Sequence, residues 1–139
     1  MPISRNQARD IAKVFFDLSH ELGAYRFTHW GHLTPTQRRQ IEDIEWDLLN
    51  YSSNFVTTAV GIVLHDMHKD LKAITDATAK AKKAVVTIQA VKDVLSVATA
   101  LVVLGGAITS HNPLAIAGAA VDLVKVAEDT IGKHNNGNA

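Results

Sequence analysis

The sequence predicts an all-α protein, an elongated antiparallel helical bundle of three to four helices with a C-terminal apolar helical hairpin. Apolar residues recur at spacings of three and four along most of the chain, which is the period of an α-helix. Only three prolines and eight glycines occur among 139 residues, too few for an all-β protein with many turns. The third observation is an uncharged run of 28 residues, 94–121, which is typical of helices buried on most sides. A mass of 15.1 kDa suits one domain, which we expect to span residues 1–133.

The first helix is predicted from a capping box. Ser4 is placed to accept a hydrogen bond from the third helical amide, and the Gln7 side chain can reach back to the amide of Ser4. We expect this helix to cover about 4–22 and to end at Gly23. The aromatic residues that follow are expected to anchor packing around the next connection: Tyr25, Phe27, Trp30, Trp46 and Tyr51.

The second helix has the strongest local start signal in the chain. Thr34 is an N-cap residue, Pro35 suits the first helical position, and Gln37 completes a second capping box. No further proline follows for more than seventy residues. We therefore expect a long helix over about 35–75.

A reversal is expected between residues 70 and 83, because one unbroken helix would be far longer than a domain of this size. We place it near Thr75-Asp76, so that a third helix covers about 77–109. A heptad-like seam of apolar residues runs across this region: Met67, Leu71, Ile74, Ala81, Val85 and Ile88. This seam predicts helices that pack side by side, within the chain or against a second copy.

The last helix begins at a clear turn. Asn112 is the predicted N-cap and Pro113 the first helical residue, and the helix is expected over about 113–131. Residues 134–139 are polar and are expected to form a disordered tail.

The uncharged segment, residues 94–121, is the most unusual feature of the sequence. It supports two interpretations, the buried centre of a helical bundle or an element that moves into a bilayer or an oligomer. Lysines lie just before it and suit anionic lipid headgroups. The residues expected to contact membrane or partner are Val94, Leu95, Val97, Leu101, Val102, Val103, Leu104, Ile108, Leu114, Ile116 and Val121.

Over about residues 64–126, this pattern of long helices around a small-residue apolar hairpin resembles helical pore-forming toxins and colicin-type channel domains. The resemblance implies a non-enzymatic, membrane-active component whose uncharged hairpin can insert into a bilayer or an oligomer. The alternative is a helical scaffold or interaction protein that oligomerises through the seam. The expected partners are accordingly membrane lipid, a second copy, or another helical protein.

Other chemistry has little support in the sequence. The weak candidates for metal ligands are His65 and His68, whose spacing places two imidazoles on one side of a helical turn. There is no cysteine, no glycine-rich phosphate loop and no nucleophile motif, so we expect neither an enzyme nor a cofactor. Fourteen basic residues balance fourteen acidic ones, which argues against nucleic acid as a partner.

No signal peptide is recognisable at the N-terminus, where charged and amide residues follow Ser4 directly. The expected location is the cytoplasm, with secretion by a non-classical route as the other option.

Overall fold

A computed structural model describes residues 3–58, 62, 64, 66–87 and 90–137, with side chains as far as Gly132. These residues form an all-α bundle without strands, as predicted, but with five helices rather than three to four. The helices are α1 (Arg5–Thr28), α2 (Pro35–Thr57), α3 (Met67–Thr87), α4 (Val91–Thr109) and α5 (Pro113–Gly137), with a short 3-10 turn, Trp30–His32, between α1 and α2.

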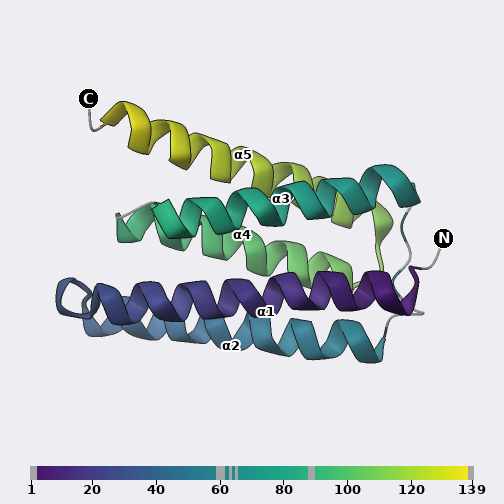
Figure 1. Ribbon diagram of the computed structural model, residues 1–139, viewed down its shortest axis with the longest axis horizontal. Coiled ribbons are helices and arrows are strands. Elements are labelled where there is room, and N and C mark those ends of the chain that lie inside the picture. Colours follow the sequence, from purple (N-terminus) through teal and green to yellow (C-terminus); the bar gives the residue numbers. More distant parts are fainter. Residues whose placement is uncertain (1–2, 59–61, 63, 65, 88–89, 138–139) are drawn as a thin grey trace.

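The helices are arranged in three layers (Figure 1). α1 and α2 pair along their whole length, α3 lies on α1 while α4 lies on α2, and α5 covers both α3 and α4. The chain reverses at each connection, so that consecutive helices are antiparallel. The core runs through all layers, and its largest fully buried side chains are Phe15, Leu18, Leu22, Ile41, Leu48, Phe55, Ile62, Leu64, Ile74, Leu101 and Leu104.

The start of α1 is as predicted, but its end is not. Both hydrogen bonds of the Ser4–Gln7 capping box are present. Gly23, the expected stop, lies inside α1, which continues to Thr28. A Cβ on this glycine would stand 3.0 Å from a carboxylate oxygen of Glu45, so the position is one where α1 and α2 approach closely.

The predicted helix over 35–75 is wrong, because the helix that begins at Pro35 ends at Thr57 and a new helix begins at Met67. The capping box of Thr34 and Gln37 is confirmed, and α2 ends at Thr57 within a β-branched run that disfavours helix. α3 then starts at Met67. Its cap is Asp66, whose Oδ1 accepts a hydrogen bond from the amide of Lys69 at 3.0 Å.

The predicted reversal at Thr75-Asp76 is also wrong, since both residues lie inside α3. The Asp76 carboxylate pairs with Lys72 at 2.9 Å, one helical turn earlier. The reversal instead falls between the end of α3 at Thr87 and the start of α4 at Val91, so the expected helix over 77–109 is divided between two elements. The sequence 85–88 consists of four β-branched residues, which are poor helix formers.

The last turn is confirmed, while the last helix is longer than predicted. Asn112 Oδ1 accepts hydrogen bonds from the amides of Leu114 and Ala115 at 3.1 and 3.3 Å. His111 takes a left-handed conformation with φ of 61°, which tightens the turn between α4 and α5. Because α5 runs to Gly137, residues 134–137 of the expected disordered tail are helical; residues 138–139 lie outside the described part.

Candidate functional site

The residues predicted for membrane or partner contact divide between two faces of the α4–α5 hairpin. Three of them are among the most exposed apolar side chains of the described chain: Val103 at 56%, Leu114 at 74% and Val121 at 64%. Leu95 and Val102 are half-buried. The remaining six are buried in the core: Val94, Val97, Leu101, Leu104, Ile108 and Ile116. The hairpin is therefore part of the core and part of the surface.

The buried face of α4 meets α2 at very short range. A Cβ on Gly105 would overlap the ring of Tyr51, and one on Gly106 would lie 3.5 Å from the Tyr51 hydroxyl. The small residues in this part of α4 thus let the aromatic ring approach the helix backbone closely. Burial raises the pKa of Tyr51, and the charge of Asp47 adds to the effect, so the phenol is neutral at physiological pH.

The outer face of the hairpin changes from charged at its open end to uncharged near the turn. On α4 the exposed positions recur at spacings of four, three and four, and they change from Lys92 through Ser96 and Thr99 to Val103. On α5 the exposed stripe starts with Leu114, Gly118 and Val121 and becomes charged only afterwards. Charges therefore lie at the open end of the hairpin, and the half nearest the turn carries none.

Four polar side chains of the uncharged segment make hydrogen bonds within the hairpin itself, while Thr99 and His111 are exposed to solvent. The hydroxyls of Ser96, Thr109 and Ser110 donate to carbonyls of their own helix at 2.7 to 3.0 Å. The side chain of Asn112 caps α5. None of the side-chain hydrogen bonds among the described residues crosses from this segment to another helix. The hairpin consequently packs on its neighbours through apolar contact alone over residues 94–121.

The α1–α2 pair is held together differently, by polar contacts between the helices. Ser19 donates to the carbonyl of Glu45 at 2.9 Å, and Ser52 donates to the carbonyl of Ala12 at 2.7 Å. Arg26 pairs with the Glu45 carboxylate at 2.7 Å, and this hydrogen bond raises the pKa of the guanidinium. These links join α1 to α2 without any residue of the hairpin.

Among the described side chains, one exposed ion pair joins α5 to α3. Lys80 Nζ lies 2.8 Å from a carboxylate oxygen of Glu128, and both side chains are about half exposed, at 42% and 55%. Such a pair contributes at most about 1 kcal/mol. Its α5 member, Glu128, lies beyond the uncharged segment, nearer the C-terminus.

One helix in the described part of the chain, α4, is long and apolar enough to cross a membrane. It has 19 residues, and 39% of its apolar window is buried within the bundle. At 1.5 Å per residue it is about 28 Å long, close to the roughly 30 Å of a bilayer hydrocarbon core.

The predicted seam lies within the bundle. Ile74, Ala81 and Val85 are buried, whereas Met67 and Leu71 are half-buried against the core. Ile88 lies outside the described residues. Ala77 and Ala84 share the buried face of α3 and were missing from the predicted set, although their spacing to Ile74 and Ala81 is the same three-residue step.

Of the two histidines singled out as weak metal ligands, only His68 lies among the described residues. His68 is exposed on the first turn of α3, and His65 lies outside the described residues. Among the described side chains, no three from His, Cys, Asp and Glu are close enough to hold a metal ion.

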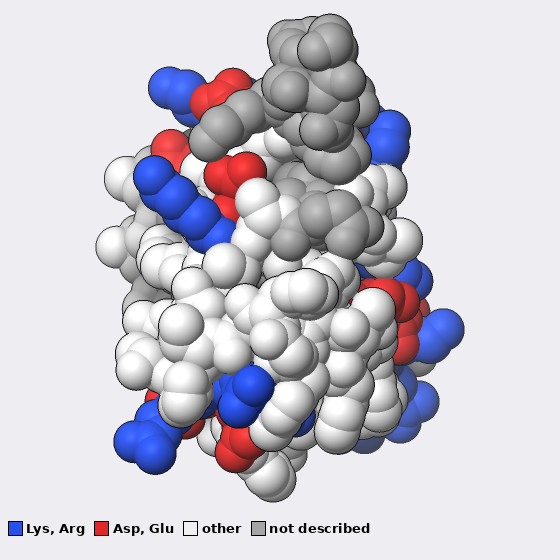
Figure 2. Space-filling model, turned by 90° about the vertical axis from the view of Figure 1, so that its left-hand side faces the viewer, with Lys and Arg blue, Asp and Glu red and all other residues white. Residues whose placement is uncertain are grey.

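Of the aromatic residues expected to anchor the first connection, three are largely exposed to solvent. Phe27, Trp30 and Trp46 are 70%, 44% and 60% exposed. Phe27 and Trp30 stack on each other at the α1–α2 connection, with the Arg38 guanidinium 4.3 Å from the Trp30 ring centre. Figure 2 shows this end of the bundle, where uncharged side chains cover the middle and charged ones lie mostly toward the edges.

Comparison of the chain with protein-family models, with curated proteins and with solved structures gives no match.

Proposed function

We propose that this protein is a non-enzymatic, membrane-active helical bundle whose α4–α5 hairpin leaves its neighbours and enters a lipid bilayer. The observation that supports this most is that, among the described residues, no side-chain hydrogen bond ties the uncharged segment to another helix. A bilayer offers no hydrogen-bond partners, so only elements that satisfy their own polar groups can enter it. Ser96, Thr109, Ser110 and Asn112 keep their hydrogen bonds when the hairpin leaves its neighbours, so only the exposed Thr99 and His111 would exchange water for lipid.

The distribution of charge along the hairpin suits entry by the turn first. The half near the turn exposes Leu114 and Val121, whose transfer out of water is favourable by about 25 cal/mol per Å² of apolar surface. Lys92 and Lys125 lie toward the open end and would remain at the headgroups, each contributing about 1 kcal/mol on an anionic surface. The α1–α2 pair keeps its own polar links and would stay outside the lipid.

The alternative function, oligomerisation through the seam, has less support. Ile74, Ala81 and Val85 are buried within one chain, so they present no apolar stripe to a second copy. Assembly through them would require α3 to separate from its own neighbours.

The proposal is tested by release of a trapped dye from vesicles that contain anionic lipid. Val103→Asp places a charge on the outer face of α4, where it is exposed in the closed bundle and should change the free energy of unfolding by no more than about 0.5 kcal/mol. Within a bilayer the same carboxylate costs about 2.5–3.5 kcal/mol. We therefore expect this variant to keep its fold and lose most of the dye release.

Val86→Asp is the matched control, because Val86 is exposed to the same extent, 57% against 56%, but lies on α3. It should release dye as the unmodified chain does. If neither the unmodified protein nor Val86→Asp releases dye or binds the vesicles, the membrane function is refuted. Equal loss of dye release in both variants would show that a charge at any exposed valine has this effect, and that the hairpin has no specific role.

A further inference from the structure

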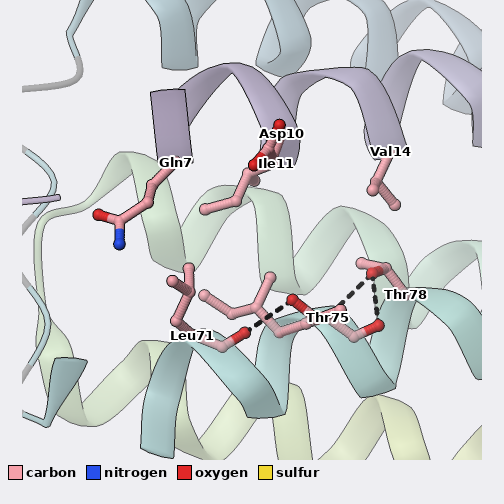
Figure 3. A pocket seen from close by; sticks show the side chains of 8 residues that line it. Gln7, Asp10, Ile11, Val14, Leu71, Thr75 and Thr78 are labelled. Atoms are coloured by element: carbon pink, nitrogen blue, oxygen red, sulfur yellow. Dashed lines mark hydrogen bonds between the residues drawn. The ribbon is translucent and has the colours of Figure 1, made fainter. Parts of the chain in front are cut away.

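A small cavity lies between α1 and α3, on the side of the bundle away from the α2–α4 contact (Figure 3). Its volume is about 200 Å³. Ile11, Ile74 and Thr78 are buried and form its floor. The half-buried Val14 and Leu71 form its walls, and Figure 3 shows Ile11 and Val14 directed from α1 toward α3.

The polar atoms around this cavity are mainly hydrogen-bond acceptors. Thr75 donates its hydroxyl proton to the carbonyl of Leu71 at 3.0 Å, and Thr78 donates to the carbonyl of Ile74 at 2.8 Å. Each hydroxyl oxygen therefore has only lone pairs left to offer. Asp10 adds a carboxylate at the rim, where it is exposed to solvent.

Gln7, the remaining polar residue of the lining, is half committed elsewhere. Its Oε1 accepts the hydrogen bond from the amide of Ser4 in the capping box, at 2.8 Å. Only the N–H groups of its side-chain amide remain available as donors to a ligand. The cavity thus combines a floor that is apolar apart from the Thr78 oxygen with a rim that carries the Asp10 carboxylate and the Thr75 oxygen, against the amide donors of Gln7.

We infer that this cavity binds a small primary alkylammonium ligand. The side chains of Ile11 and Ile74 take the alkyl chain, and the ammonium group, which has three donors and no acceptor, reaches the Asp10 carboxylate and the Thr75 oxygen at the rim. The volume corresponds to about seven water-sized groups at roughly 30 Å³ each, which suits a chain of about six carbons. A carboxylate ligand of the same length would meet acceptors and a like charge at the rim. The site is separate from the α4–α5 hairpin, so its failure and that of the membrane function are independent.

The test is titration of the full chain with hexylammonium, hexanol and hexanoate, followed by the amide resonances of Ile11, Ile74 and Thr78. We expect hexylammonium to bind most tightly, hexanol less so, and hexanoate least. Asp10→Asn should weaken hexylammonium binding by about two- to fivefold, the range for an exposed ion pair, and leave hexanol unchanged. Asp17→Asn, on the same helix but outside the lining, is the control and should bind as the unmodified chain does.

A second variant tests the position of the ligand. Val14→Phe places a ring where the cavity now is, and it should remove the resonance changes for hexylammonium and hexanol alike while circular dichroism stays helical. Should this variant not fold, Asp10→Asn alone decides the proposal, because its substitution is at an exposed rim position. Equal binding of hexanoate and hexylammonium, or unchanged hexylammonium binding in Asp10→Asn, would overturn the inference.

Discussion

Two glycines of the α4–α5 hairpin occupy opposite environments, and the sequence does not distinguish them. Gly105 faces the ring of Tyr51, where a Cβ would overlap three ring carbons. Gly118 lies on the exposed stripe of α5, and a Cβ there would have no neighbour within 4 Å. The first glycine is required by close packing of two helices, and the second only lowers the helix propensity of α5.

Alanine at each position should therefore change stability in opposite directions. Gly118→Ala should raise the free energy of unfolding by up to about 1 kcal/mol, the difference in helix propensity. Gly105→Ala should lower it by about 1–3 kcal/mol, because the Tyr51 ring must move. Denaturant unfolding measures both changes. In a Tyr51→Ala background Gly105→Ala should no longer destabilise, and a loss of the same size there would show that the ring is not the cause.

Helix starts could be predicted from the sequence, but the breaks in the middle of the chain could not. Ser4, Thr34 and Asn112 cap helices through side chains whose hydrogen bonds follow from residue type and spacing. The ends of α2 and α3 carry no such mark, since β-branched runs only weaken a helix and tertiary packing decides where it stops. Asp66 is a favourable N-cap residue type, but the predicted helix over 35–75 runs through it, because no proline marks a break there.

Helix α3 is stabilised by the buried part of its seam. Ile74→Ala should lower the free energy of unfolding by about 2–5 kcal/mol, because the side chain is 2% exposed and its removal leaves a void. Leu71→Ala should cost less, since Leu71 is half-buried at the wall of the cavity between α1 and α3. Thermal or denaturant unfolding of the two variants checks the order. An Ile74→Ala cost no larger than that of Leu71→Ala would contradict the described burial of α3.

At the scale of the whole molecule, the bundle joins two differently stabilised parts. α1 and α2 are linked by interhelical hydrogen bonds and a partly buried ion pair, whereas the uncharged segment of α4 and α5 contacts the rest through apolar surface. The sequence indicated the uncharged segment but not which of its residues face outward. Outward orientation depends on where α2, α3 and α5 lie around α4, and this is set by contacts between residues far apart in the chain.

The most direct test of the central proposal is the environment of Val103 in the presence of lipid. The chain has no cysteine, so Val103→Cys and Val86→Cys each carry a single fluorescent label whose emission shifts to the blue in hydrocarbon. On addition of vesicles with anionic lipid, we predict a blue shift and stronger emission at position 103, with position 86 unchanged. Emission at position 103 that stays that of a water-exposed label, on protein shown by flotation to be vesicle-bound, would contradict insertion of the hairpin.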